Sequence, residues 1–231
     1  MALVAPRTDM LALNRVWLPG SAPSLRPDVL DEVIAVFREA GAPRFVIHWP
    51  PAARPANASD WFAERGFRAG HPMAKMFRLT SAGFATQLGV SGVDIVESGA
   101  RDGALFGVIA AVGNEAPPFM APGFNSTIGE VGWRHYFAMD GGRPVAAAAM
   151  RIGGDVAWCG FAGTMPDHRR RGAQSALLMR RVRDAAAAGC TWVTCETMAD
   201  AAERPSPSFR NMTRLGFEVA YLRTNQVLTL E

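Results

Sequence analysis

A short basic loop between a predicted strand and a predicted helix carries the residues best suited to binding an anion. Three consecutive arginines precede Gly172 in the segment TMPDHRRRGAQSALL at 164–178. A helix that begins after Gly172 offers unpaired backbone N–H groups and the positive end of its dipole. Glycine lets a phosphate approach the backbone, and arginine adds charge-assisted hydrogen bonds. The segment 169–175 therefore predicts a pyrophosphate site.

The same arginine run is compatible with two other interpretations, a solvated surface turn and a nucleic-acid patch. The chain of 231 residues has a formal net charge of +3, and Lys75 is its single lysine. A nucleic-acid binder would be expected to concentrate basic residues and interleaved aromatics on one face. Only 169–171 is clustered in this way, so we predict no nucleic-acid partner.

The segments around the loop predict a mixed α/β (α+β) fold. Turn signals at Asp140-Gly141-Gly142 and at Gly153 separate three strand-like runs, which indicates an antiparallel meander. A Pro/Gly-rich loop, with room for a short helix, is expected at 114–128. Strands are expected at 92–97, 132–139, 143–151, 154–165, 191–196, 217–223 and 224–230, and helices at 101–113, 173–188 and 206–215.

These motifs resemble the GNAT (Gcn5-related) N-acetyltransferase family over about residues 90–231. The run RRRGAQ at 169–174 fits the family's loop Arg/Gln-x-x-Gly-x-Gly/Ala, except that Gln174 replaces the final Gly/Ala. The run SFRNMTRLGF at 208–217 is similar to the second cofactor-side motif. The resemblance implies a mostly antiparallel central sheet flanked by helices, with acetyl-CoA as cosubstrate. The cofactor-binding residues it implies are Ala162, Gly163, Thr164, Met165, Arg169, Arg170, Arg171, Gly172, Ala173, Gln174, Ser175 and Asn211.

The resemblance also implies a mechanism, in which the amine of a small molecule or amino-acid-like acceptor attacks the thioester directly in a ternary complex. In the family the strand before the loop separates from its neighbour. Its free backbone groups then bind the pantetheine arm and polarise the thioester carbonyl, as preorganised donors do. Here these groups would belong to residues 162–165.

The proton-transfer residues are less well defined than the cofactor loop. Glu196, at the end of the strand 191–196, is the first candidate for the base; Glu130 is the second, and the alternative is a surface carboxylate. The family's usual tyrosine acid falls at Met212, so the acid is expected to be Tyr221 or a water.

The N-terminal region predicts a partial repeat of the C-terminal one. Residues 27–79 have the order helix, strand, helix, strand pair, and Gly41 and Gly66 match Gly189 and Gly216. We therefore expect a degenerate GNAT-like half-domain at 1–85 before a complete domain at 90–231. The alternative is an unrelated addition. The copy lacks the arginine-glycine loop and is not expected to bind CoA.

Composition predicts the remaining properties. His135 and His168 are not spaced as metal ligands, so no metal is expected. Three cysteines without a CxxC pair predict buried reduced thiols. With no long apolar run, we expect no membrane association, a cytoplasmic location, and a monomer or homodimer. The rival function is an inactive acyl-CoA-binding or sensing module that acts through a protein partner.

Overall fold

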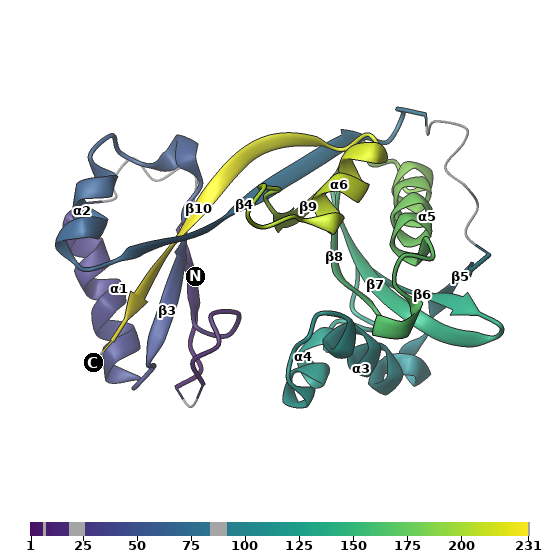
Figure 1. Ribbon diagram of the computed structural model, residues 1–231, viewed down its shortest axis with the longest axis horizontal. Helices are drawn as coiled ribbons and strands as arrows, with labels where there is room; N and C mark the ends of the chain where they lie inside the picture. The colour runs from purple at the N-terminus through teal and green to yellow at the C-terminus, as the bar shows by residue number, and fades with distance from the viewer. Residues whose placement is uncertain (7, 19–25, 84–91, 231) are drawn as a thin grey trace. The chain divides into compact units, whose positions relative to one another are not determined.

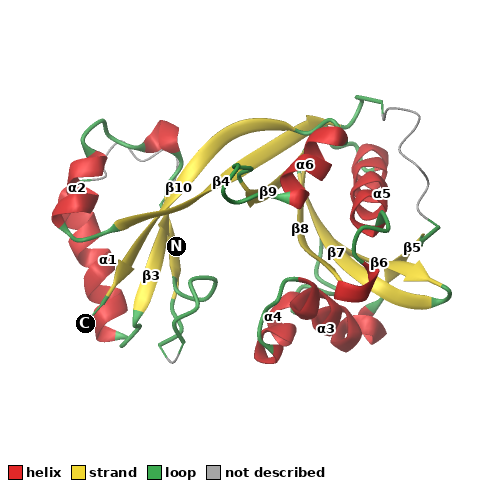
Figure 2. Ribbon diagram, viewed as in Figure 1, coloured by secondary structure: helices red, strands yellow, loops and turns green. Residues whose placement is uncertain are grey.

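The chain folds into two units, and two long strands contribute residues to both. The computed structural model describes residues 1–6, 8–18, 26–83 and 92–230 (Figures 1 and 2). Unit 1 comprises Met1–Ala74 and Tyr221–Glu231, and unit 2 comprises Lys75–Ala220. The shared strands are β4 (Arg68–Leu79) and β10 (Glu218–Thr229). The division into a half-domain at 1–85 and a complete domain at 90–231 stays a prediction.

Unit 1 is a small sheet covered by two helices. Its strand order is β1-β2-β3-β10-β4. Leu30, Ile34 and Phe37 are buried on one side of α1 because they recur at helical spacing, and the Phe37 ring stacks on Phe45 of β3 at 4.2 Å. The elements besides β4 and β10 are β1 (Ala2–Leu3), β2 (Arg15–Trp17), α1 (Pro27–Glu39), β3 (Arg44–His48), η1 (Pro51–Ala53) and α2 (Ala58–Glu64).

Unit 2 contains the predicted meander and loop. Its strand order is β4-β9-β8-β7-β6-β5. Pairing is antiparallel from β5 to β8 and parallel between β8 and β9. The elements are β5 (Asp94–Ser98), η2 (Ala100–Asp102), α3 (Gly103–Gly113), η3 (Pro118–Met120), α4 (Ala121–Asn125), β6 (Trp133–Asp140), β7 (Arg143–Gly153), β8 (Val156–Thr164), η4 (Pro166–His168), α5 (Ala173–Ala187), β9 (Trp192–Met198) and α6 (Pro207–Arg214).

The sheet of unit 2 has helices on both faces, with α3 and α4 on one and α5 on the other (Figure 1). Successive side chains of a strand point to opposite faces. On β6, His135 packs edge-on against Phe106 of α3, whereas the Tyr136 hydroxyl donates to Asp184 of α5 at 2.8 Å. We call these the α3 face and the α5 face.

The predicted repeat order is confirmed within the described residues. The segment α1-β3-α2-β4 has the order of α5-β9-α6-β10. All four matched glycines have positive φ: 70° and 76° at Gly41 and Gly66, 84° and 78° at Gly189 and Gly216. Each ends a helix in the left-handed conformation that glycine adopts without strain.

Two predicted strand pairs are wrong. Residues 68–79 form the single strand β4, and residues 218–229 form the single strand β10. No residue of β10 has a positive φ of the kind that tight hairpin turns require. The end of β10 instead pairs with β3 in unit 1, through Gln226 with Ile47 and Val227 with Val46.

Candidate active site

The end of β8 is distorted by a β-bulge. In the pairing with β7, Gly160 lies opposite Ala149 and Gly163 opposite Ala147, so Phe161 and Ala162 both oppose Ala148. Phe161 has φ of 51°. A bulky residue in this region is an outlier that costs about 1–3 kcal/mol, and such strain concentrates at functional sites. The bulge lies immediately before the predicted cofactor loop.

After the bulge, the backbone amides of Thr164 and Met165 point in opposite directions. The Met165 amide donates to the Val145 oxygen at 2.9 Å, so it is not available as one of the predicted free donors. Because backbone groups of an antiparallel strand alternate in direction, the amide of Thr164 points to the β9 side. The Ala162 carbonyl accepts a hydrogen bond from Asn114 at 2.9 Å. Thr164 is therefore the best-placed donor among residues 162–165.

β8 and β9 separate beside this amide. Their parallel register runs from Val156 with Trp192 to Cys159 with Cys195, although β8 continues to Thr164 and β9 to Met198. The strand separation expected from the family resemblance is thus present. Glu196 is the first β9 residue after the last register pair, and by strand alternation it lies on the α3 face.

The C-terminal end of α3 packs directly on the bulge. A Cβ at Gly113 would clash with the Thr164 amide nitrogen, and one at Gly163 would lie 2.8 Å from the Ala110 oxygen. Asn114 also donates to the Ala110 oxygen at 2.8 Å, which ties the helix end to the strand. Sequence analysis missed this contact, because glycine at a helix end is also typical of a simple helix stop.

A buried arginine binds the carbonyls that flank the bulge. Arg181 of α5 is 1% exposed, and it donates to the oxygens of Leu177, Ala149 and, at 3.5 Å, Gly160. Ala149 and Gly160 form the last register pair before the bulge. Buried polar groups need partners, so Arg181 stabilises the distorted strand. Its place on the apolar stripe with Leu177 was a sequence signal that we missed.

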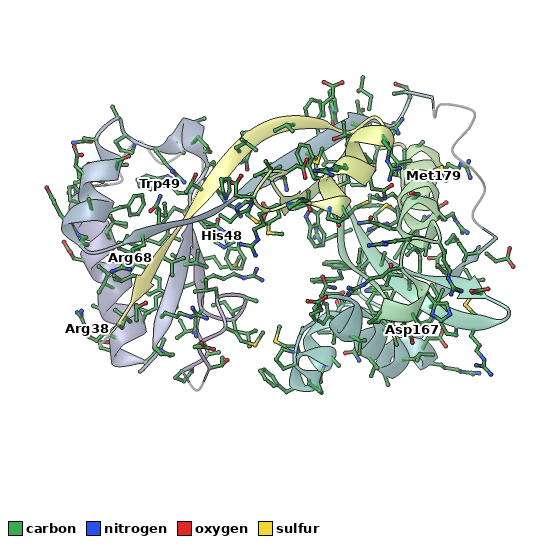
Figure 3. All side chains as sticks on the ribbon, viewed as in Figure 1. Arg38, His48, Trp49, Arg68, Asp167 and Met179 are labelled. Atoms are coloured by element: carbon green, nitrogen blue, oxygen red, sulfur yellow. The ribbon has the colours of Figure 1, made fainter. Side chains whose placement is uncertain are left out.

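The loop after β8 has the backbone of an anion site. Arg170 has φ of 64° and Gly172, the N-cap of α5, has φ of 85°. Left-handed residues beside right-handed ones turn successive N–H groups toward one concavity. α5 has no side-chain cap and no acidic residue in its first turn. Asp167 and Met179, labelled in Figure 3, mark the loop and the helix that follows it.

The three arginines of the loop have different partners. Arg169 pairs with Glu115 at 3.0 Å, and Arg171 approaches Asp140 at 3.5 Å. Such exposed ion pairs contribute about 0–1 kcal/mol and break readily. Among the described residues, Arg170 has no ion-pair partner. All three side chains are exposed beside the start of α5.

Four polar side chains join the start of α5 to α6. Gln174 donates to Ser208 at 2.9 Å, Ser175 donates to Asn211 at 2.7 Å, and Asn211 donates to Gln174 at 3.0 Å. Asn211 is 6% exposed. The structure thus brings together Gln174, Ser175 and Asn211, which the sequence predicts as cofactor residues, and adds Ser208.

Met212 fills the position where the family resemblance expects a tyrosine. It is 8% exposed, and its sulfur lies 3.4 Å from the Cys195 sulfur. Burial raises the pKa of Cys195 to about 12, so this thiol stays protonated and is a poor nucleophile. All three cysteines are buried and free.

The remaining candidates lie on separate elements. Tyr221 is a half-buried residue of β10 in unit 1, and Glu130 is exposed in the turn before β6. His135 is buried beside Phe106, and burial lowers its pKa to about 4. Among the described residues no group of three or more His, Cys, Asp or Glu side chains gathers as metal ligands do.

This arrangement matches a known domain. Residues 115–200 match the family model described as "Acetyltransferase (GNAT) domain". The chain contains a GNAT acetyltransferase domain. The matched residues belong to a family of acyltransferases whose cosubstrate is acyl-CoA.

Solved structures support the GNAT fold over nearly the whole chain. A GCN5-related N-acetyltransferase from Kribbella flavida is 19% identical, with TM-score 0.69, over 98% of this chain and 87% of that one. One from Sphaerobacter thermophilus is 16% identical, with TM-score 0.67, over 90% and 70%. A tandem GNAT protein from the clavulanic acid biosynthesis pathway is 13% identical, with TM-score 0.63, over 90% and 72%. No curated protein matches the sequence.

The described part of the GNAT chain contains no helix that is both long and apolar enough to cross a bilayer.

Proposed function

We propose that this GNAT protein transfers the acetyl group of acetyl-CoA to the amine of a small molecule or amino-acid-like acceptor. The observation that carries the proposal is the joint position of the bulge, the gap between β8 and β9, and the uncapped start of α5. They lie consecutively along one stretch of chain, from Phe161 to Gly172. Acetyl-CoA is an extended ligand. Its thioester needs the bulge and the gap, and its pyrophosphate needs the uncapped helix start.

In this proposal the pyrophosphate binds at the start of α5. It accepts hydrogen bonds from the backbone between Arg170 and Ser175, and the exposed arginines add positive charge. Asn211 fixes Gln174 and Ser175 so that the first turn of α5 keeps its shape. The pantetheine arm lies in the gap beyond Cys159 and Cys195.

The reaction is a direct acyl transfer. The amine nitrogen forms a bond to the acetyl carbon, and the carbon–sulfur bond then breaks. The Thr164 amide donates to the carbonyl oxygen, where negative charge develops. Glu196, directly or through a water, accepts the proton that the amine loses, and the CoA thiolate takes a proton from water. The assignment of Tyr221 as the acid stays a prediction from the sequence.

One observation favours a second function, the inactive acyl-CoA-binding module. Met212 is packed against Cys195, so no hydroxyl is supplied from α6 at that position. The module binds acyl-CoA but does not release CoA in the presence of amines.

Titration calorimetry of acetyl-CoA, followed by CoA thiol release with a panel of amines, tests both functions. We expect micromolar binding and amine-dependent thiol release. If acetyl-CoA binds but none of the amines causes thiol release, the result favours the inactive module. If acetyl-CoA does not bind, both functions are refuted. The absence of a metal, the cytoplasmic location, and the monomeric or homodimeric state remain predictions.

A further inference from the structure

Four aromatic side chains form a cluster on the α3 face of unit 2, next to the bulge. We define the aromatic cluster as Phe124, Trp133, Trp158 and Phe161. Trp133 and Phe161 are nearly parallel, with centroids 5.7 Å apart and an interplanar angle of 4°. Trp158 stands edge-on to both, at 5.9 Å and 5.5 Å, and Phe124 stands edge-on to Phe161 at 5.8 Å. All four side chains are only partly buried.

The cluster is built around a strained residue. Phe161 has a positive φ, which a bulky side chain adopts only when its surroundings hold it there. Its ring contacts the other three members, which supply that restraint. Gly160 adds to it, because any Cβ at this position would clash with the Trp158 ring.

The strain places an aromatic ring beside the proposed reaction centre. Phe161 immediately precedes Ala162 in the bulge, and the Thr164 amide follows. Trp158 lies opposite Thr194 in the β8–β9 register. Because alternate side chains share a face, Glu196 is on the α3 face with the aromatic cluster. The cofactor loop leads into α5, which packs on the opposite face.

The charges near the aromatic cluster suit a cation at the β9 side. Glu196 is two residues after Thr194 on β9. Glu130 is exposed in the turn before β6, and its backbone oxygen accepts a hydrogen bond from the Trp133 amide at 3.1 Å. Arg151 is opposite both tryptophans in register, but its Nη1 lies 3.2 Å from where a Cβ of Gly153 would be, toward the β7–β8 turn. An aromatic face also attracts an ammonium group.

We propose that the aromatic cluster binds the acceptor, and that the acceptor is a primary amine carried by a short chain on a flat aromatic ring. This inference rests on the proposed function. The acceptor ring packs against Trp158 and Phe161, and its ammonium group points toward Glu196, where it loses its proton. Small aliphatic amines lack the ring and bind weakly.

Calorimetric titration of the CoA-loaded protein with 2-phenylethylamine and with ethylamine tests the inference without requiring turnover. We expect 2-phenylethylamine to bind at least about tenfold more tightly than ethylamine. The aromatic contact and the buried area of the ring together contribute more free energy than a tenfold change in affinity requires. Trp158→Leu should weaken 2-phenylethylamine binding about tenfold and leave ethylamine binding unchanged.

Trp192→Leu is the matched control. Trp192 is a partly buried indole on β9 that packs against Phe77 at 5.5 Å, outside the aromatic cluster. It should leave the affinity for both amines unchanged. Equal binding of the two amines by the wild-type protein, or equal effects of Trp158→Leu and Trp192→Leu, would overturn the inference. Failure of acetyl-CoA to bind would instead refute the proposed function. Titration of the CoA-free protein with the two amines would then test the aromatic cluster separately.

Discussion

The two helix-strand-helix-strand segments of this GNAT protein share an element order but differ at the start of their first helix. α1 begins after Arg26, and Asp28 in its first turn forms an ion pair with Arg26 at 2.7 Å. The Arg26 guanidinium keeps the pKa of Asp28 low, so this carboxylate stays ionised at the helix start. α5 begins after Gly172 and has no acidic residue there. A carboxylate at a helix N-terminus takes the place that an anionic ligand would occupy.

The strands that follow these helices differ in the same sense. Counted from the matched glycines Gly41 and Gly189, His48 of β3 takes the place of Glu196 of β9. Burial and the nearby Arg223 and Arg15 lower the pKa of His48 to about 3. The comparison shows that one arrangement of elements supports two roles, and that the role depends on a few side chains at the helix start and strand end.

The largest expected effect breaks the α5 side of this comparison. Gly172→Glu should weaken acetyl-CoA binding by more than about 100-fold, because it places a carboxylate where the pyrophosphate binds. Calorimetry measures the affinity. Gly189→Glu is the control, because its φ of 84° nearly equals the 85° of Gly172 at the other end of α5, so both variants carry similar backbone strain. Asp28→Asn in α1 should have no effect. Similar losses in the two glycine variants would contradict the site.

The second prediction concerns the strand end. Glu196→Gln should lower kcat about 100-fold and leave the affinity for acetyl-CoA unchanged, because the amide cannot accept the proton from the amine. Thiol release measured across pH provides the readout, and the pH–rate profile of the variant should differ from that of the wild type. Glu218→Gln, at an exposed position of β10, is the control. An unaltered profile would remove Glu196 from the mechanism.

The third prediction sharpens the comparison at the buried face of the helices. Counted from the same glycines, Val33 of α1 takes the place of Arg181. Arg181→Met should lower the free energy of unfolding by about 1–3 kcal/mol, because the oxygens of Ala149 and Gly160 lose their donor. Urea unfolding measures this loss, with the exposed Arg183→Met as control. An equal loss in both variants would show that the bulge does not need Arg181.

The smallest expected effect is a pH dependence of unit 2. Burial lowers the pKa of His135 from about 6.5 to about 4, so the folded state favours the neutral ring. Its contribution is present above pH 6.5 and is lost as pH falls toward 4. Between pH 6.5 and 5 this amounts to about 1.5 kcal/mol. Chemical unfolding of wild type and His135→Gln at both pH values measures the difference. Parallel losses in the two proteins would contradict it.

The sequence by itself determined the strand, loop and helix around Gly172, the antiparallel meander before them and the repeated order of elements. These features depend on local chemistry: glycine at a positive φ, arginines beside a helix start, and turn residues between strands. The predicted borders of the meander and of α5 are confirmed to within a few residues. The errors at β4 and β10 arose because a long strand and a hairpin have the same alternating pattern when no glycine marks the turn.

Only the tertiary structure decided which groups meet at the bulge. A bulge is a difference between two strands, so the residues of β8 alone do not reveal that Phe161 and Ala162 both oppose Ala148. Likewise, Asn114 and Arg181 reach the bulge from helices distant in sequence, and the aromatic cluster joins β6, β8 and α4. Such contacts depend on the register and packing of elements, which residue types and local spacing do not specify.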